Sequence, residues 1–285
     1  MSKITVENVS YVYSAHTPFE VKALDGVSVN IESNCITGII GHTGSGKSTL
    51  VQMFNGLLRP SSGRILIDGV DIWAKPGKIS EFRYRVGLVM QYPEYQLFEE
   101  TVEADIAFGP KNMGLDKDEV SKRVLEAADF VGLDHENLKK SPFDLSGGQR
   151  RRAAIAGIMA MRPEVLVLDE PSAGLDPAGK SAIFEGIKSY AEATGAAVII
   201  VSHSMDDMAK YCENIIVMSS SRLVMSGKRH EIFSRGDELE AIGLGVPQMT
   251  YLMRLLSDMG IDVPTGIYTV DDAEKALTEL LGGGK

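Results

Sequence analysis

The first part of the chain alternates apolar and polar residues, and this period of two predicts antiparallel strands between Ile4 and Ile31. The apolar members of this alternation are Ile4, Val6, Val9, Tyr11, Tyr13, Val27, Val29 and Ile31. Ile36–Ile40 is instead an unbroken apolar run, which is typical of a strand that is buried on both faces. A helix is predicted at Thr49–Leu58, and further strands are predicted at Arg64–Ile67 and Val86–Met90.

The middle of the chain, from about Tyr92 to Met161, has a helical pattern instead. Asp116 and Glu119 have the spacing of a capping box. Apolar residues then recur at helical spacing, at Val120, Val124, Ala128 and Val131. Continuous apolar strands return at Val165–Leu168 and Val198–Val201, with a helix expected between them.

The C-terminal part contains a predicted hairpin and a tail. Ile215–Met218 and Leu223–Met225 enclose a polar turn at Ser219–Arg222. Beyond about Arg235 the tail is expected to form two helices, of which Pro247 can begin the first. Their apolar residues are Met249, Leu252, Met253, Leu256 and Met259, then Ala273, Ala276, Leu277, Leu280 and Leu281. We expect the first, flexible face to pair subunits; the alternative is that it packs on the chain's own core. Gly282–Gly284 is expected to be a frayed end.

Composition and charge narrow the possible roles. The net charge of −10 leaves no broad basic field, so we expect no nucleic-acid partner. Cys35 and Cys212 have no metal or redox spacing and are expected to be buried thiols. No apolar run approaches the roughly 20 residues of a membrane span. Alternation starts at once at Lys3–Glu7, which leaves no room for a signal peptide. We therefore expect a soluble chain whose membrane spans, where needed, come from another polypeptide.

A glycine-rich loop follows the strand Ile36–Ile40 and precedes the predicted helix. Its residues are Gly41, His42, Thr43, Gly44, Ser45, Gly46, Lys47 and Ser48. In this context its backbone N–H groups can turn toward phosphates at a helix N-terminus. Lys47 can reach the β- and γ-phosphates, the Ser48 hydroxyl can ligate Mg²⁺, and Thr49 can hydrogen-bond the α-phosphate. The loop thus predicts a bound nucleotide; the alternative is a glycine-rich turn without a ligand.

An acidic pair ends the strand Val165–Leu168. At the tip of a buried strand, Asp169 can serve as a Mg²⁺ partner, and Glu170 is then free to polarise the attacking water. Pro171–Asp176 follows directly, and Leu145-Ser146-Gly147-Gly148-Gln149 lies a short distance upstream. That pentapeptide is a serine N-cap with glycines at the start of an expected helix, which is a site for an anion.

The glycine loop, the pentapeptide and the acidic pair, in this order, resemble the ATP-binding-cassette family over most of the chain. The resemblance implies an α/β fold: a P-loop NTPase (RecA-like) core with an N-terminal antiparallel β-subdomain. It also implies that residues 1–235 form the cassette, with a helical subdomain inserted at about 92–161. Residues 236–285 would be a small helical extension, expected to dimerise.

The resemblance also implies roles for individual residues. Ser146, Gly147, Gly148 and Gln149 would bind ATP held by the opposite subunit of a head-to-tail dimer, and Asp176 would be a further nucleotide-binding residue. Gln91 matches the glutamine that touches Mg²⁺ and water, and His203 the histidine that contacts the γ-phosphate. Tyr13, rather than Tyr11, matches the aromatic residue that stacks on adenine.

The segment after Gln91 resembles one type of cassette ATPase in particular. Gln91–Val102, with Asp105–Pro110 after it, is similar to the second ATPase type of energy-coupling factor transporters, which import vitamins and transition metals. The resemblance implies a groove that receives arginine-bearing coupling helices of a transmembrane subunit. The expected receptor residues are Glu94, Tyr95, Leu97, Phe98, Glu99 and Glu100, which offer carboxylates beside apolar surface. It also implies a location at the cytoplasmic face of the membrane and a second ATPase subunit, expected to differ from this chain.

Other readings remain open at this point. The chain could serve another importer, for cobalt, nickel or amino acids. A non-transport cassette protein usually has two cassettes, long coiled coils or zinc insertions, which are absent from this sequence. A nucleotide switch or small-molecule kinase needs no pentapeptide acting on a partner's ATP. The imported substrate cannot be identified, because this subunit would meet the substrate-binding membrane subunit only indirectly.

Overall fold

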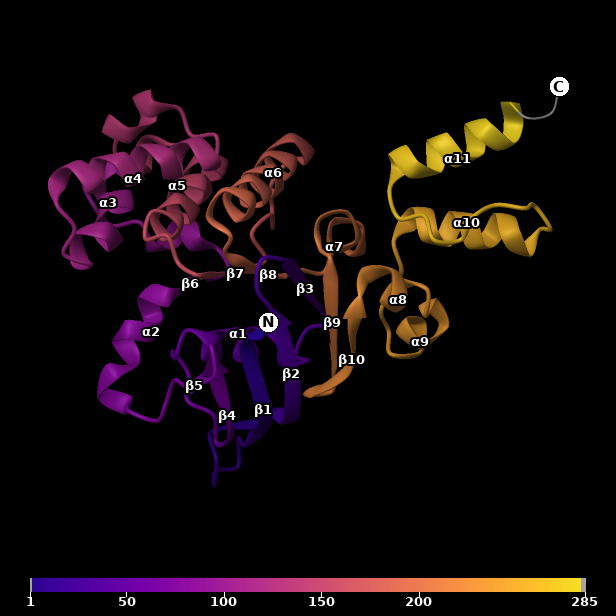
Figure 1. Cartoon of the computed structure of the whole chain (residues 1–285), viewed down its shortest axis with the longest axis horizontal. Helices are drawn as coiled ribbons and strands as arrows, with labels where there is room; N and C mark the ends of the chain where they lie inside the picture. The colour runs from indigo at the N-terminus through magenta and orange to yellow at the C-terminus, as the bar shows by residue number, and fades with distance from the viewer. Residues whose placement is uncertain (1, 283–285) are drawn as a thin grey trace.

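The computed structural model describes residues 2–282, and its centre is a six-stranded sheet (Figure 1). The strand order is β10-β9-β3-β8-β7-β6. The strands span Ile36–Ile40 (β3), Val86–Val89 (β6), Val165–Asp169 (β7), Ala197–Val201 (β8), Asn214–Ser219 (β9) and Arg222–Lys228 (β10). All pairs except β9–β10 are parallel, and β9–β10 is the predicted hairpin. Every residue of β3, β7 and β8 is buried, as their unbroken apolar runs predicted.

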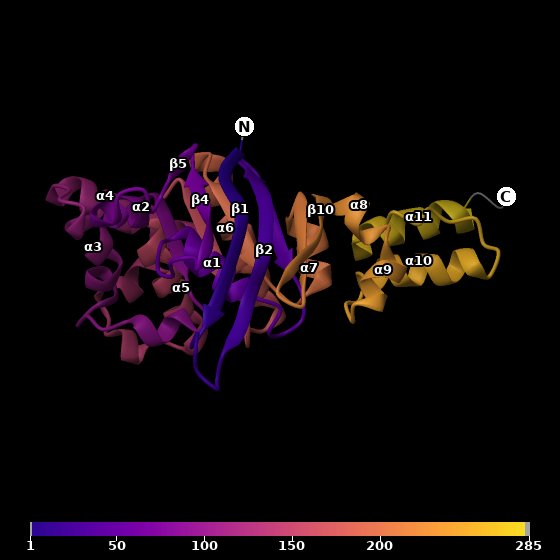
Figure 2. The ribbon, with the colours of Figure 1, turned by 90° about the horizontal axis from the view of Figure 1, so that it is seen from below.

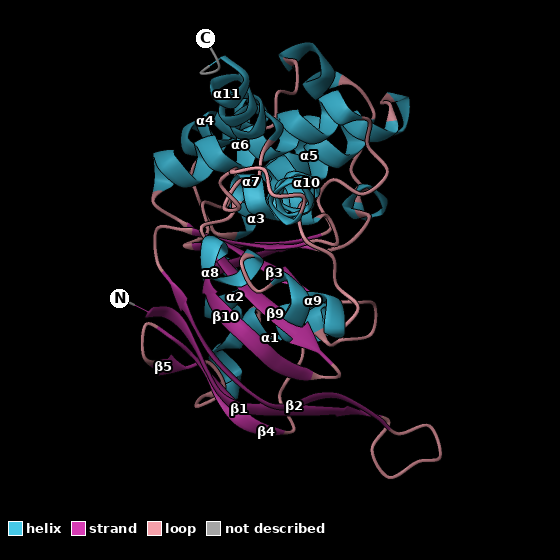
Figure 3. Ribbon diagram, turned by 90° about the vertical axis from the view of Figure 1, so that its right-hand side faces the viewer, coloured by secondary structure: helices cyan, strands magenta, loops and turns pink. Residues whose placement is uncertain are grey.

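A second, antiparallel sheet covers one face of this centre (Figure 3). Its order is β2-β1-β4-β5, with strands Ser2–Tyr13 (β1), Val21–Glu32 (β2), Ser62–Ile67 (β4) and Val70–Asp71 (β5). Helix α1 (Lys47–Phe54) contributes Leu50, Val51, Met53 and Phe54 to one apolar core with both sheets. The predicted antiparallel β-subdomain is therefore confirmed. The apolar residues of α1, which follow the glycine loop, pack in the core between the two sheets.

Helices cover the other face of the central sheet. They are α5 (Gly147–Met159), α6 (Pro177–Thr194) and α7 (Met205–Tyr211), while α3 (Val102–Asn112) and α4 (Lys117–Phe130) pack against α5. Their apolar faces join β3, β7, β8 and β9 in the largest core cluster. Gly186 allows α6 to approach the end of α4, because a Cβ there would collide with the carbonyl oxygen of Phe130. The helical region 92–161 is therefore joined to the central sheet through a shared apolar core.

Some local expectations need correction. Asp116 caps α4 by accepting from the Glu119 amide at 2.9 Å, but the capping box is incomplete. The Glu119 carboxylate instead pairs with Arg123 at 2.7 Å, one helical turn later. Helix α1 begins and ends earlier than predicted. Its end is set by Gly56, whose left-handed backbone with φ 69° terminates the helix. A short helix α2 (Ile79–Arg85) and strand β5 were not expected. Both cysteines are buried and free, as predicted.

The tail extends away from the body as a helical hairpin (Figure 2). Helices α8 (Arg229–Phe233) and α9 (Gly236–Ala241) lead to α10 (Gln248–Asp258) and α11 (Val270–Gly282). Met253, Val263, Ile267 and Ala273 form a small core of its own. Of the expected frayed end, Gly282 closes α11, whereas Gly283 and Gly284 lie outside the described residues. Within residues 2–282, no helix combines the length and apolar character that crossing a bilayer requires.

Candidate active site

The glycine loop joins β3 to α1 at the carboxyl end of the parallel strands. Gly41 and Gly46 have φ angles of 154° and 100°, and a Cβ at either position would collide with a backbone carbonyl. At Gly44, with φ 81°, a Cβ would meet nothing within 4 Å, so this part of the loop faces open space. The loop is thus shaped by its own packing on one side and presents free backbone on the other, as phosphate binding requires.

Lys47 is nearly buried and lies under the loop. Its Nζ donates to the carbonyl oxygens of Gly41 at 2.6 Å and of His42 at 2.9 Å. Burial lowers the pKa of Lys47, while the nearby charges of Glu170 and Asp169 act in the opposite direction. The ammonium group is therefore held by two carbonyl oxygens near two carboxylates, and a phosphate group could accept its third hydrogen bond.

A cavity of about 370 Å³ opens beside this loop. It brings together most of the residues that the sequence indicated: Tyr13, Thr43, Gly44, Gly46, Lys47, Ser48, Thr49, Gln91, Asp169, Glu170 and His203. These residues come from β1, the loop, α1 and the ends of β6, β7 and β8. The carboxyl ends of parallel strands meet at one edge of a sheet, and this explains their convergence. Gly41 and Ser45 of the same loop are buried and do not line the cavity. The His42 ring is directed elsewhere, with its Nε2 atom 3.2 Å from Ser219 Oγ.

The carboxyl groups of Asp169 and Glu170 are the electrostatic centre of the cavity. Burial, with the neighbouring Asp169 charge as a further cause, raises the pKa of Glu170 to about 7. Burial also raises the pKa of Asp169, although a Ser48 hydrogen bond and the Lys47 charge act against it. Glu170 has a left-handed backbone with φ 52°, directly after the last residue of β7.

His203 and Tyr13 both line the cavity. His203 Nε2 lies 3.4 Å from Glu170 Oε1, and burial together with the Lys47 charge lowers the pKa of His203. The Tyr13 hydroxyl lies 3.2 Å from Thr49 Oγ1, and the Tyr13 side chain is 40% exposed. Tyr11 instead packs against the core between the sheets and meets the Tyr13 ring edge-on at 4.8 Å. Tyr13 is therefore the aromatic residue at the cavity.

The pentapeptide does not line this cavity. Ser146 caps α5: its Oγ accepts from the Gln149 amide at 3.3 Å, and Gln149 Oε1 accepts from the Ser146 amide at 2.9 Å. Ser146 and Gly147 are exposed. Asp176 is also exposed and caps α6 through a 2.7 Å hydrogen bond from the Gly179 amide. Within one chain, these residues are thus apart from the other predicted nucleotide contacts.

Known proteins resemble this chain over almost its whole length. A family model described as "ABC transporter" matches residues 24–173. The energy-coupling factor transporter ATP-binding protein EcfA2 of Clostridium tetani is 52% identical over 97% of this chain and 96% of that protein. The protein of the same name from Clostridium acetobutylicum is 53% identical over 99% of each.

Solved structures agree with these relatives. The structure of cbiO1 from Clostridium perfringens, part of the ABC transporter complex cbiONQ, is 40% identical with a TM-score of 0.75. It covers 89% of this chain and 99% of that one. A dimeric structure of the ATP-binding cassette MJ0796 with ADP and Pi is 27% identical with a TM-score of 0.72, over 79% of this chain and 98% of that one.

This chain belongs to the ABC transporter family. As a member it is an ATP-binding protein whose reaction is ATP hydrolysis coupled to transport. The predicted P-loop NTPase fold is confirmed by the same relatives and by the observed sheet topology.

One residue of the expected receptor groove, Glu94, already has a partner within the chain. Glu94, in the short turn Pro93–Gln96, forms a two-point ion pair with Arg151 on α5, with distances of 2.7 and 3.0 Å. Both carboxylate oxygens are therefore engaged within the chain, which the sequence could not indicate because the partners are 57 residues apart. The expectation that Glu94 receives a partner's guanidinium stays a prediction, and in this structure Arg151 holds its carboxylate.

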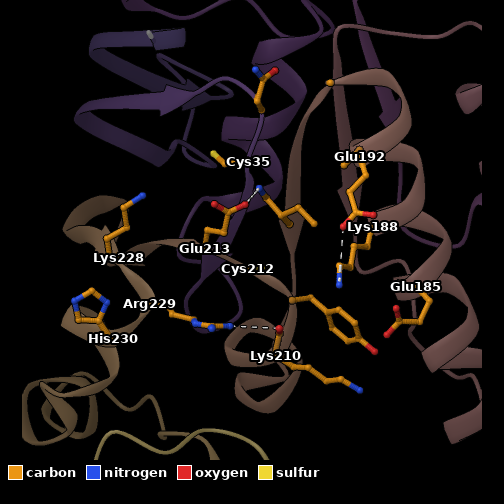
Figure 4. A pocket seen from close by; sticks show the side chains of 15 residues that line it. Cys35, Glu185, Lys188, Glu192, Lys210, Cys212, Glu213, Lys228, Arg229 and His230 are labelled. Atoms are coloured by element: carbon orange, nitrogen blue, oxygen red, sulfur yellow. Dashed lines mark hydrogen bonds and ion pairs between the residues drawn. The ribbon is translucent and has the colours of Figure 1, made fainter.

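A larger cavity of about 750 Å³ lies at the amino ends of β3 and β9, away from the phosphate loop (Figure 4). Its wall mixes cationic and acidic side chains that have partners of their own. Lys188 lies 4.0 Å from Glu192, and Arg229 donates to the Ala209 carbonyl oxygen at 2.7 Å. Most of the residues that the sequence indicated for nucleotide binding line the smaller cavity, and none of them lines this one.

Proposed function

We propose that this chain binds Mg²⁺–ATP in the cavity beside Lys47 and, with a second ATPase subunit, powers an energy-coupling factor importer at the cytoplasmic face of the cell membrane. One observation carries the proposal. A single cavity holds a phosphate loop, a buried lysine, two carboxylates of raised pKa and a histidine, while the exposed Ser146 and Gly147 of the pentapeptide lie outside it. The names of the relatives at about 50% identity support the type of importer.

The residues of the cavity divide the work on ATP. Amides of the loop and Lys47 would bind the β- and γ-phosphates, Thr49 the α-phosphate, and Tyr13 would stack on adenine. Glu170, with a pKa near neutral pH, is suited to take a proton from water. His203, 3.4 Å from Glu170, can orient that carboxylate and contact the γ-phosphate.

The oxygen atoms of the same cavity fit a magnesium ion. The Ser48 hydroxyl, the Gln91 side-chain oxygen and the Asp169 carboxylate border one space, and a hydrogen bond links Ser48 to Asp169. Hard oxygen donors, few in number and combined with phosphate oxygens, are the ligands that Mg²⁺ prefers. Bound there, the ion would neutralise phosphate charge.

The exposed pentapeptide fits a head-to-tail dimer. Ser146 and the amides of Gly147, Gly148 and Gln149 form a helix N-terminus that is open to solvent. Such an N-terminus is suited to the γ-phosphate of a nucleotide held by another subunit. The dimeric MJ0796 cassette is a solved example of two cassettes together. We infer that the partner here is a second, different ATPase subunit.

An apolar groove on the helical region is our candidate for coupling to a transmembrane subunit. Leu97, Phe98 and Phe108 line a cavity of about 340 Å³, and the rings of Phe98 and Phe108 meet edge-on at 4.9 Å. Its wall includes Asp105, which is buried and accepts only from the amides of Phe98 and Glu99 among the described residues. Burial raises the pKa of Asp105. Asp105 is thus the carboxylate in the wall of this groove, and Glu94, Glu99 and the exposed Tyr95 precede it in the chain as further candidate contacts.

Phe108→Ser and Asp105→Asn are each expected to reduce the transmembrane subunit that co-purifies from a detergent extract by about fivefold or more. Phe108→Ser removes apolar contact area, and Asp105→Asn removes the charge that would attract an arginine. ATP affinity of the isolated chain should change less than about twofold, because neither residue borders the ATP cavity. Leu125→Ser on α4 is the matched control, since Leu125 is 42% exposed and Phe108 44%. Undiminished co-purification of both variants would contradict the groove proposal.

The tail is proposed to stabilise the pairing of the two ATPase subunits, through a face that shares only Met259 with the predicted one. Met249, Met253 and Leu256 pack inside the α10–α11 hairpin, so this part of the predicted stripe is already covered. The exposed apolar stripe of α10 is instead Tyr251, Leu255 and Met259, at four-residue spacing. An uncovered apolar stripe on a projecting hairpin is typical of a contact between subunits.

Tyr251→Glu combined with Leu255→Glu is expected to weaken association of the two ATPase subunits by about tenfold or more. A carboxylate at the centre of an apolar contact loses its hydration without gaining a hydrogen-bond partner, and this raises the free energy of the associated state. Sedimentation of the purified pair over a range of concentrations measures the change. Ser257→Glu, also exposed on α10, is the control and should leave association unaltered. Equal association constants for the double variant and the wild-type chain would show that the tail serves only its own core.

A further inference from the structure

Arg151 is the most deeply buried cation of the helical region that bears the pentapeptide. Only 3% of the residue is exposed, although it lies near the start of α5 beside the exposed Ser146. Its neighbours on α5 differ: the Nε atoms of Arg150 and Arg152 have no hydrogen-bond partner among the described residues. A buried guanidinium is tolerated only where it is paired and hydrogen-bonded, so the partners of Arg151 define its role.

These partners belong to two other segments of the chain. On one side, Nη2 and Nε donate to the two oxygens of Glu94 at 2.7 and 3.0 Å, and the guanidinium lies 5.8 Å from the centre of the Tyr92 ring. On the other side, Nη1 donates to the carbonyl oxygen of Ala173. Tyr92 and Glu94 follow Gln91 directly, and Ala173 lies in the turn that begins at Glu170.

One planar side chain thus joins three segments that face ATP: the residues after Gln91, the start of the pentapeptide helix and the turn after Glu170. A guanidinium can do this because its donors point in several fixed directions in one plane, whereas a lysine presents a single flexible group. The hydrogen bonds and charge of Arg151 also keep the pKa of Glu94 below its ordinary value, although burial acts in the opposite direction. Removing one partner would strand the other's charge in a largely buried position.

We propose that Arg151 is a positioning residue for ATP hydrolysis, which holds the segment after Gln91 and the turn after Glu170 in a fixed relation to the pentapeptide helix. The three segments then move as one unit when ATP is bound or hydrolysed. The inference rests on the proposed roles of Gln91 and Glu170. It assigns Arg151 no contact with ATP, since Arg151 is not among the residues that line the ATP cavity.

Steady-state ATP hydrolysis by the full chain in its assembly tests the proposal. Arg151→Gln should lower kcat by about tenfold, with KM for ATP changed by less than about twofold, because the lost contacts act on Glu170 and not on the phosphate loop. Glu94→Gln should do the same, and the double variant should be no worse than either single one. Arg151→Lys should restore little, since one ammonium cannot reach both partners. If Arg151→Gln does not fold, the same comparison of kcat and KM is made with Glu94→Gln, which removes the same ion pair from the other side.

Arg123→Gln is the matched control. Arg123 also pairs with a carboxylate, Glu119 at 2.7 Å, and donates to a backbone carbonyl, that of Met161 at 3.2 Å. It touches none of the three segments, so its loss should lower stability while leaving kcat unchanged. An equal fall of kcat in Arg123→Gln, or an unchanged kcat in Arg151→Gln, would overturn the proposal in favour of a purely structural role.

Backbone amide exchange provides a measurement that needs no hydrolysis, and it therefore separates this inference from the proposed function. In Arg151→Gln, exchange should speed up in residues 92–97 and 171–175, which are distant in sequence. In Arg123→Gln, the change should stay within α4 and the end of α5. Faster exchange confined to the residues around position 151 would show that Arg151 does not hold the two other segments.

Discussion

Replacing Glu170 by glutamine is expected to lower kcat for ATP hydrolysis by about a hundredfold or more, while ATP binding is retained. Glutamine keeps the shape of the side chain but cannot take a proton from water. The Glu170 carboxyl, with a pKa raised to about 7 by burial and by Asp169, is the proton acceptor that the cavity offers near neutral pH. The loop and Lys47 are unaltered, so bound ATP should accumulate and hold the dimer closed.

Single-turnover and steady-state hydrolysis, with ATP binding measured on the same preparation, check this prediction. Glu164→Gln is the matched control, because Glu164 and Glu170 flank opposite ends of β7. Glu164 pairs with Lys3 at 2.6 Å and with Arg85 at 2.9 Å, and is not among the residues lining the ATP cavity. Its loss should affect stability and not kcat. Steady-state turnover of Glu170→Gln close to that of the wild-type chain would remove Glu170 from the role of base.

A dimer in which both subunits carry Lys47→Ala, or both carry Ser146→Arg, is expected to hydrolyse no ATP. A dimer with Lys47→Ala on one subunit and Ser146→Arg on the other is expected to hydrolyse ATP again. Lys47→Ala removes the buried cation of the phosphate loop, and Ser146→Arg fills the helix N-terminus that would receive the partner's γ-phosphate. In a head-to-tail dimer, both defects then fall in one composite site and the other site is intact. The purified mixed dimer should retain about half of the wild-type rate, because one composite site of two is intact.

The control carries both substitutions on one chain, mixed with the wild-type chain. Each composite site of that mixed dimer has one defect, so the purified mixed dimer should be inactive. Where the partner is a different subunit, the substitutions are divided between the chain and the matching positions of that partner. Absence of any recovery in the divided arrangement would contradict a site shared between subunits, and with it the reason why the pentapeptide lies outside the cavity of its own chain.

The part of the site that was predictable consists of residues whose chemistry is local in sequence. Gly41–Ser48 needs only a strand before it and a helix after it to present backbone amides to a phosphate. Asp169 and Glu170 need only the end of a buried strand. The convergence of these segments with Gln91 and His203 follows from parallel strand order, and the observed cavity agrees with it.

The sequence by itself determined the alternation of elements, the nucleotide chemistry and the family, because short motifs and apolar periodicity encode them. Only the tertiary structure decided that Arg151 engages Glu94, that Asp105 lines one cavity with Phe98 and Phe108, and that the α10–α11 hairpin covers Met249, Met253 and Leu256 of the predicted stripe. Periodicity states which face of a helix is apolar, but not which element covers it. Likewise, a charge in the sequence does not reveal its counterion, since ion pairs form between residues that packing brings together across long stretches of chain.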